Sequence, residues 1–144
     1  MKLIKYIRHY IWRTKIGVRY FYFTKIMKMN IHPTVRIAAE ARLDGTYPKG
    51  IHIDEETYIA GGAIIYTHDY CRAIHNDTYI GKRCFIGANA IIMCGVKIGD
   101  EVVVGSGAIV TKDVPSNCIV AGNPAKIIKQ DIKTKKFGQL VKAE

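Results

Sequence analysis

The chain has 144 residues, 49% of them hydrophobic, and a formal net charge of +10 at pH 7. This length suits one globular domain, and because charged residues interrupt every long apolar stretch, the sequence predicts neither a membrane-spanning helix nor a secretory signal peptide. No two of the four cysteines form a CxxC pair, so we expect reduced thiols, with Cys84 in the core, and a cytoplasmic protein.

The first 30 residues are basic and aromatic. They hold eight Lys or Arg, no acidic residue and seven of the 14 aromatic side chains, and their apolar residues fall near helical spacing. Such a segment can bind an anionic membrane face, bind nucleic acid, or cap the domain that follows. We expect a peripheral membrane contact, a cap, or both together, and no nucleic-acid partner.

Residues 31–122 repeat with a period of six. An aliphatic residue recurs at every sixth position apart from two breaks, at 49–52 and at about 69–79. The aliphatic positions are Ile31, Ile37, Leu43, Ile53, Ile59, Ile65, Ile80, Ile86, Ile92, Ile98, Val104 and Val110. The position four residues later is small or β-branched except at Tyr47 and Asp69, which lie beside the breaks. We therefore divide the chain into segments 1–30, 31–122 and 123–144.

A fixed short period is typical of a solenoid, in which each repeat buries its apolar face only by stacking on its neighbours. Six residues suit a short strand and a turn, whereas an α-helix requires apolar spacings of three and four. Three such units close a triangular coil, which predicts an all-β solenoid of about four parallel coils that begin at Ile31, Ile53, Ile80 and Ile98. The aliphatic and small residues then point inward, and both breaks become loops at the third corner of a coil.

The repeat ends at Val114, and residues 118–121 read as a short apolar strand. Because proline is tolerated in the first turn of a helix, we expect a short C-terminal helix after Pro124 that includes residues 125–129. A lysine-rich tail follows from Asp131.

The repeats, the stretch VGSGAIVTKDVP at 104–115 and the stretch AGNPAK at 121–126 resemble the hexapeptide-repeat acyltransferases. Within that family the likeness is to the maltose and galactoside O-acetyltransferases and to the polysaccharide O-acetyltransferases, and it covers about residues 31–130. The resemblance implies a left-handed parallel β-helix, a homotrimer, and direct transfer of an acetyl group from acetyl-CoA without a metal. The left-handed sense comes from the resemblance alone, because the general crossover rule predicts a right-handed connection.

The resemblance places a histidine general base in the loop that leaves the middle of the solenoid, which here is His68. A neutral imidazole suits the task because it takes the proton of a hydroxyl as the hydroxyl attacks the thioester. A second group must hold the imidazole in the right tautomer. Asp69 is adjacent, and Asp44, Asp77 and a backbone carbonyl are the alternatives. His75 is a second candidate for the base or a substrate contact, and Tyr66 and Thr67 are expected to line the acceptor pocket.

For the acyl donor, we expect backbone N–H groups at the glycine corners Gly87 and Gly105 to stabilise the oxyanion. By resemblance, four further residues line the pantetheine arm of CoA: Ala88, Ser106, Thr111 and Lys112. Lys126 and Lys129 match basic positions that meet the phosphates, although lysine binds phosphate as a point charge without the arginine fork. The alternative for these two lysines is an ordinary solvated helix face.

The acceptor stays open at this point, because residues 1–30 show no counterpart of the acceptor-binding domain found in sugar acetyltransferases. The basic aromatic leader suits a lipid-linked or membrane-proximal glycan. N-acetylation of an amino sugar or a nucleotide sugar is the main alternative, because the same base serves both nucleophiles. A non-enzymatic β-helix scaffold is a further alternative. A gamma-type carbonic anhydrase is disfavoured because it needs three zinc-binding histidines, and no histidine follows His75.

Overall fold

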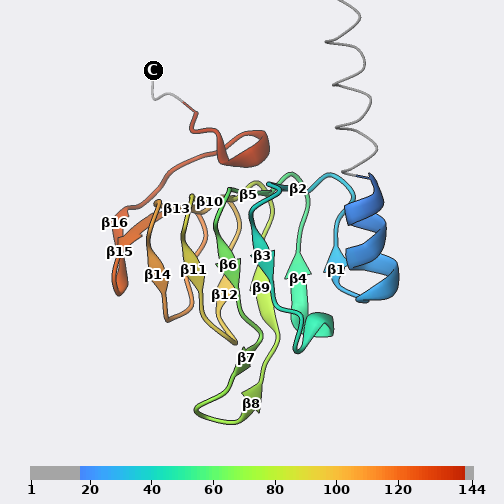
Figure 1. The fold of residues 1–144 in the computed structure, drawn as a ribbon. Helices are drawn as coiled ribbons and strands as arrows, with labels where there is room; N and C mark the ends of the chain where they lie inside the picture. The colour runs from blue at the N-terminus through green and yellow to red at the C-terminus, as the bar shows by residue number, and fades with distance from the viewer. Residues whose placement is uncertain (1–16, 142–144) are drawn as a thin grey trace, which may run out of the picture.

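The computed structural model describes residues 17–141, and the predictions made for residues 1–16 lie outside this range (Figure 1). Residues 17–21 are α-helical, and the helix continues as the π-helical turn η1 (Tyr22–Ile26). Tyr20, Phe23 and Met27 pack against the core beside β1 (Asn30–Ile31). The described part of the N-terminal segment therefore caps the first coil. Within residues 17–141, no helix is long and apolar enough to cross a bilayer.

The body of the molecule consists of three sheets that the chain visits in turn, and their strands are parallel except at the last strand of sheet B (Figure 1). Sheet A contains β1, β4 (Ile51–Ile53), β9 (Thr78–Ile80) and β12 (Lys97–Ile98). Sheet B contains β2 (Arg36–Ile37), β5 (Tyr58–Ile59), β10 (Phe85–Ile86), β13 (Val103–Val104), β15 (Ile119–Gly122) and β16 (Ala125–Lys129). Sheet C contains β3 (Arg42–Leu43), β6 (Ile64–Ile65), β11 (Ile91–Ile92) and β14 (Ile109–Val110).

The strand register agrees with the predicted coils. The four expected coil starts, Ile31, Ile53, Ile80 and Ile98, are successive partners in sheet A. Each coil therefore stacks on the one before it at the spacing of parallel strands. The division of the chain at residues 30 and 122 stays a prediction.

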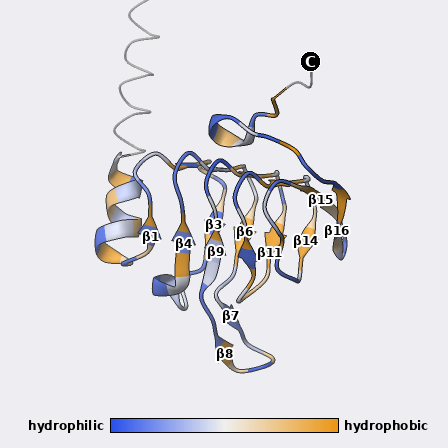
Figure 2. Ribbon diagram, turned by 180° about the vertical axis from the view of Figure 1, so that it is seen from behind, coloured by the Kyte–Doolittle hydropathy of each residue, from blue (hydrophilic) through white to orange (hydrophobic). Residues whose placement is uncertain are grey.

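The core runs along the inside of the three sheets. Ten of the twelve aliphatic positions are buried, and the other two, Ile37 and Leu43 of the first coil, are half-buried and pack against the core. Each fully buried isoleucine contributes about 1.5–3 kcal/mol through removal of its side chain from water. Buried Thr57 keeps both hydrogen-bonding roles, because its hydroxyl donates to the Gly81 carbonyl at 2.7 Å and accepts from the Cys84 N–H at 3.0 Å. Figure 2 shows the hydrophobic strands that enclose this core.

Both breaks in the repeat lie at the same corner, as predicted. The 3-10 turn η2 (Pro48–Gly50) separates β3 from β4, and the antiparallel hairpin of β7 (His68–Asp69) and β8 (Ile74–His75) separates β6 from β9. Each loop leaves sheet C and returns to sheet A, and Figure 1 shows the β7–β8 hairpin extending away from the coils.

The prediction of a short C-terminal helix that includes residues 125–129 is wrong, because these residues form the strand β16. β16 pairs antiparallel with β15, the last parallel strand of sheet B. Gly122, with φ of +98°, allows the reversal between the two strands. The pairing satisfies backbone groups of β15 that would otherwise form an open sheet edge, and Ile127 and Ile128 are β-branched residues that favour a strand.

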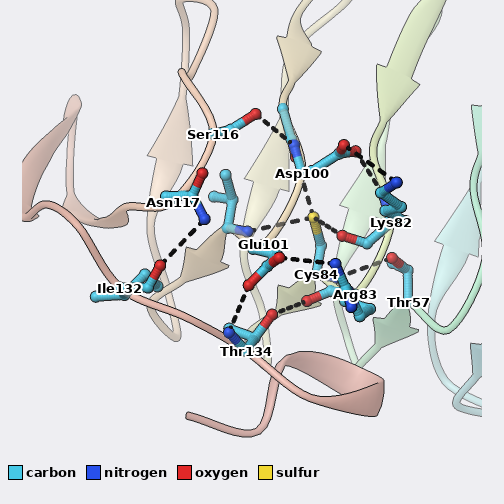
Figure 3. A network of polar contacts seen from close by, with 12 residues as sticks. Thr57, Lys82, Arg83, Cys84, Asp100, Glu101, Ser116, Asn117, Ile132 and Thr134 are labelled. Carbon is cyan, nitrogen blue, oxygen red and sulfur yellow. Dashed lines mark hydrogen bonds and ion pairs between the residues drawn. The ribbon is translucent and has the colours of Figure 1, made fainter. Parts of the chain in front are cut away.

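After β16 the chain turns back as the C-terminal strap, which we define as residues 131–141 and which contains the 3-10 turn η3 (Lys136–Gly138). The strap crosses the corners between sheets A and B, coil by coil (Figure 3). Thr134 accounts for two of its contacts: its N–H donates to the Glu101 carboxylate at 2.7 Å, and its hydroxyl donates to the Arg83 carbonyl at 2.8 Å. Further along, the Phe137 N–H donates to the Glu56 carbonyl at 2.7 Å. The Arg36 guanidinium, in the first coil, lies 3.9 Å from the centre of the Phe137 ring.

Candidate active site

The candidate site lies where the two loops meet, at the corner between sheets C and A. His68 begins β7 and is paired across the hairpin with His75, the last residue of β8. The two imidazole rings have their centroids 6.4 Å apart. The Tyr66 ring meets the His68 ring edge-on at 6.0 Å, and the Tyr47 ring from the first loop meets the His75 ring edge-on at 5.5 Å. The site therefore combines an aromatic surface with two histidines.

The group that holds His68 is Asp44, which directly follows β3 in the preceding coil. One carboxylate oxygen of Asp44 lies 2.5 Å from His68 Nδ1 and accepts the backbone N–H groups of Thr67 at 2.8 Å and His68 at 3.0 Å. The other oxygen accepts the N–H of Thr46 at 2.8 Å. The Asp44 side chain is 2% exposed, whereas that of His68 is 26% exposed. A buried carboxylate with four polar partners thus fixes the orientation of a half-exposed imidazole.

These contacts also decide the charge of Asp44 and the tautomer of His68. Burial acts to raise the pKa of Asp44, but hydrogen bonds from the Thr67 N–H, the His68 ring and the Thr46 N–H outweigh it and lower the pKa from 3.8 to about 2. An ionised carboxylate only accepts hydrogen bonds, so Nδ1 of His68 carries the hydrogen. Nε2 of the neutral ring then presents a lone pair, as a general base requires.

The other two carboxylates that we considered lie elsewhere. Asp69 does not contact the His68 ring, because its carboxylate binds the Nε of Arg72 at 2.7 Å and the Arg72 backbone N–H at 3.1 Å. These bonds lower the pKa of Asp69. Asp77 binds the Nε2 of His52 at 3.0 Å. The assignment of Asp69 to the catalytic set is therefore corrected: neighbouring residues of an extended strand point to opposite sides, and the partner comes from the preceding coil.

Of the expected acceptor contacts, Tyr66 and His75 lie at the surface beside His68, but Thr67 does not. Thr67 is fully buried, and its hydroxyl donates to the Tyr47 carbonyl at 2.6 Å. Its role is to join the two loops, so the prediction that it lines the acceptor pocket is wrong. Tyr47 was not identified as a site residue from the sequence. The signal that could have identified it is that Tyr47 departs from the six-residue pattern at the first loop.

The glycine corners between sheets B and C have no free N–H at Gly87 or Gly105. The Gly87 N–H donates to the Val104 carbonyl at 2.9 Å, and the Gly105 N–H donates to the Val120 carbonyl at 2.8 Å, both in the next coil. The expectation that they stabilise the oxyanion is therefore corrected. Among the hydrogen bonds of the described residues, none uses the N–H of Ala88 or of Ser106, the residues that follow these glycines.

Thr111 and Lys112 follow β14, which is an edge strand of sheet C. Both residues are exposed, and an edge strand leaves backbone donors and acceptors on one side without a neighbouring strand. An extended chain of amides, such as a pantetheine arm, can pair with such groups in the manner of an added strand.

Lys126 and Lys129 lie on β16 and are exposed. In an ordinary strand, residues three apart point to opposite faces. Here a bulge at the end of β16 changes the register, so that Lys126 pairs with Ala121 and Lys129 pairs with Ile119. Because cross-strand partners share a face and Ile119 and Ala121 are two residues apart, the two lysines lie on the same face of sheet B.

Comparison with known proteins agrees with this architecture. Residues 78–112 match a family model described as the hexapeptide repeat of succinyl-transferase. YvoF of Bacillus subtilis strain 168 is named, provisionally, as an acetyltransferase. It is 35% identical over 117 residues, which cover 78% of this chain and 67% of YvoF. The chain belongs to the hexapeptide-repeat acetyltransferases.

Other acetyltransferases match over a smaller share of their length. The 2,3,4,5-tetrahydropyridine-2,6-dicarboxylate N-acetyltransferase of Staphylococcus aureus strain MRSA252 is 41% identical over 85 residues, which are 59% of this chain and 33% of that protein. The chain thus spans about a third of that relative.

Two solved acetyltransferase structures share the fold. The maltose O-acetyltransferase of Clostridium difficile 630 superposes with a TM-score of 0.56 at 27% identity, over 73% of this chain and 72% of that one. The polySia-specific acetyltransferase NeuO superposes with a TM-score of 0.55 at 30% identity, over 79% of this chain and 54% of that one.

Proposed function

We propose that this hexapeptide-repeat acetyltransferase transfers an acetyl group from acetyl-CoA to a hydroxyl of a sugar or a surface polysaccharide, with His68 as the general base. The observation that carries the proposal is the buried Asp44 carboxylate on His68 Nδ1, which leaves Nε2 with a lone pair toward the loop surface. Asp44 is the positioning residue, because it acts through the imidazole.

The reaction follows from that tautomer. His68 Nε2 takes the proton of the acceptor hydroxyl while the hydroxyl oxygen attacks the thioester carbonyl carbon of acetyl-CoA. The tetrahedral intermediate collapses, the C–S bond breaks, and the imidazolium returns its proton to the thiolate of CoA. The Asp44 carboxylate stabilises the imidazolium in between. The products are the acetylated acceptor and free CoA.

The donor site is proposed along the corner between sheets B and C and the edge of sheet C. The unpaired N–H groups of Ala88 and Ser106 replace those of Gly87 and Gly105 as candidate donors to the acyl carbonyl and the pantetheine amides. Thr111 and Lys112 continue the line along β14. Lys126 and Lys129, on one face of β16, supply two cations for the phosphates of CoA.

A carbohydrate hydroxyl is the acceptor that the comparisons favour, because NeuO is specific for polySia and the Clostridium difficile protein is a maltose O-acetyltransferase. The rings of Tyr47, Tyr66 and His75 around His68 offer flat surfaces that suit a sugar. N-acetylation of an amino sugar or a nucleotide sugar is the second candidate, supported by the likeness to the Staphylococcus aureus N-acetyltransferase.

The left-handed sense of the β-helix and a homotrimer complete the proposal. Ile64, Ile91 and Ile109 are successive partners on the outer face of sheet C and are only half-buried in the single chain. A row of three isoleucines between the candidate donor corner and the His68 corner suits contact with another copy. A site completed by two chains would then lie at this face.

The proposed compartment is the cytoplasm. All four cysteines are free, and Cys84, Cys94 and Cys118 are buried. Burial raises the pKa of the Cys84 thiol to about 12, which suits an inert core residue. Free thiols are typical of a reducing compartment.

The proposal is tested by an acceptor screen with radiolabelled acetyl-CoA, including neutral sugars, amino sugars and membrane-bound glycolipids. On the best acceptor, His68→Ala should lower acetyl transfer at least ~10²-fold, while CoA binding and assembly persist. His75→Ala is the matched control and should act mainly on acceptor KM. If His75→Ala abolishes turnover and His68→Ala does not, the base is His75. If only acceptors with amino groups are labelled, the proposed reaction is N-acetylation and not O-acetylation.

A further inference from the structure

The N-terminal helix presents an apolar face that nothing in the described chain covers. Val18, Phe21, Tyr22 and Ile26 are 70%, 57%, 44% and 60% exposed. They follow one another at intervals of three, one and four residues, so they lie on one side of the helix. The helix therefore has an inner apolar face that packs on the first coil and an outer apolar face that meets solvent.

The helix is tied firmly to the solenoid. The Arg19 guanidinium donates to the Ala38 carbonyl at 2.5 Å and the Ala41 carbonyl at 2.7 Å. The Tyr20 hydroxyl donates to the Ile31 carbonyl at 3.0 Å. A partner that binds the outer face of this helix would therefore fix the orientation of the whole β-helix.

The charged residues of this segment have one sign. Lys25 and Lys28 are exposed on the same segment, and the first 30 residues hold eight Lys or Arg and no acidic residue. Apolar and aromatic side chains beside unopposed cations are the features of a helix that lies in the headgroup region of an anionic bilayer. A second copy of the same segment would bring like charges together, and nucleic acid would leave the apolar side chains without a partner.

We propose that the outer face of the N-terminal helix, formed by Val18, Phe21, Tyr22 and Ile26, docks this protein on an anionic lipid surface. The apolar side chains enter the headgroup and acyl boundary, and the exposed Lys25 and Lys28 meet the lipid phosphates. This contact is independent of the acetyl-transfer chemistry, and an acetyltransferase held there would meet lipid-linked glycans.

The experiment uses the full chain with vesicles of phosphatidylcholine alone or mixed with phosphatidylglycerol. Binding is measured by flotation and by the emission of Trp12, the single tryptophan of the chain. The parent protein should bind the anionic vesicles at low salt, with a blue shift of Trp12, and bind more weakly as salt screens the charges. The double variant Phe21→Ser/Ile26→Ser should lower the partition coefficient at least about tenfold.

The matched control is Ile128→Ser/Leu140→Ser, which removes two side chains that are also exposed, at 67% and 51%, but lie far along the chain. It should bind as the parent does. Thermal unfolding of both variants shows whether the fold is retained, and the salt dependence of the parent gives a reading that needs no variant.

Four results would overturn the proposal. The parent protein does not bind anionic vesicles, or the Phe21→Ser/Ile26→Ser variant binds them as tightly as the control does, or the parent binds nucleic acid in preference to vesicles. In the fourth, sedimentation shows a higher assembly of the parent that the double variant dissociates, and the face is then a contact between copies. None of these results depends on acetyl transfer, so they leave the proposed function untouched.

Discussion

Asp44 is a buried carboxylate that stays ionised because its surroundings are organised around the charge. Two backbone N–H groups of one loop, a third from its own loop, and the His68 ring all point at its two oxygens. An ionised group with this many donors is stabilised even where burial disfavours it. The same arrangement fixes both the loop that carries the base and the tautomer of the base.

Replacement of Asp44 should therefore act on turnover. In Asp44→Asn, the amide can donate to Nδ1 and hold the tautomer in which Nε2 carries the hydrogen, so we expect kcat to fall at least ~10²-fold. Asp69→Asn is the matched control and should stay near the parent rate, because Asp69 binds Arg72 instead. The measurement is kcat and KM across pH for both variants. Equal losses would return Asp69 to the catalytic set.

Acid stability should also depend on Asp44. Its pKa falls from 3.8 to about 2 on folding, so the carboxylate adds stability above its unfolded pKa and loses it as pH falls through about 2. Asp44→Asn should therefore start less stable near neutral pH and show a shallower loss between pH 4 and pH 2. Urea unfolding midpoints over this range test the point. Parallel curves for parent and variant would assign the acid sensitivity to other groups.

Residue chemistry could be predicted from the sequence only in part. The position of His68 in a break of the repeat identified the candidate base. The carboxylate that orients its ring was one of three candidates. Asp44 lies 24 positions away, and the two meet because both loops leave the same corner of stacked coils. The pairing thus depends on the length of each loop, which the period of six does not encode.

At the scale of single elements, the glycines at the corners are explained better by the close packing of stacked coils than by a role in catalysis. A Cβ on Gly87 would lie 2.6 Å from both the Ser106 nitrogen and the Val104 carbonyl oxygen. These are backbone atoms of the next coil, and they cannot move without disturbing the ladder. The glycine is therefore required by the close approach of two coils.

Gly87→Ala should destabilise the fold by about 1–3 kcal/mol, because the added methyl group meets fixed backbone. Gly17→Ala is the control: a Cβ there meets nothing within 4 Å, and alanine favours a helix. Denaturant unfolding of both variants gives the comparison. A Gly87→Ala protein as stable as the parent, with impaired acetyl-CoA binding, would restore a direct role in the donor site.

The strands of the repeat could be predicted because their pattern is long and regular. The five residues after Pro124 have no such period, so the sequence pattern could not identify them as a strand. Local preference favoured a helix start there. The free edge of β15 decided otherwise, and an edge is a property of the assembled sheet. The expected helix failed where tertiary pairing outweighs local sequence.

At the scale of the whole molecule, the row of half-buried isoleucines on sheet C predicts assembly. Sedimentation equilibrium should give about three times 16.2 kDa. Ile91→Glu, at the middle of the row, should yield monomers that lose acetyl transfer, because three carboxylates would meet at the interface. Leu140→Glu, an exposed position on the strap, should remain assembled and active. A monomeric parent with full activity would exclude a site shared between chains.

The C-terminal strap has a consequence for how the protein is made. A linear repeat array has contacts only between neighbouring coils, so its ends can fray without the middle. Here Phe137 lies on Arg36, which joins the last part of the chain to the first coil. A ribosome releases Phe137 long after the first coil has emerged, so coils can stack during translation but are locked only after the strap has emerged. A chain cut short before the strap would leave its earliest coil unfastened and open to quality-control proteases.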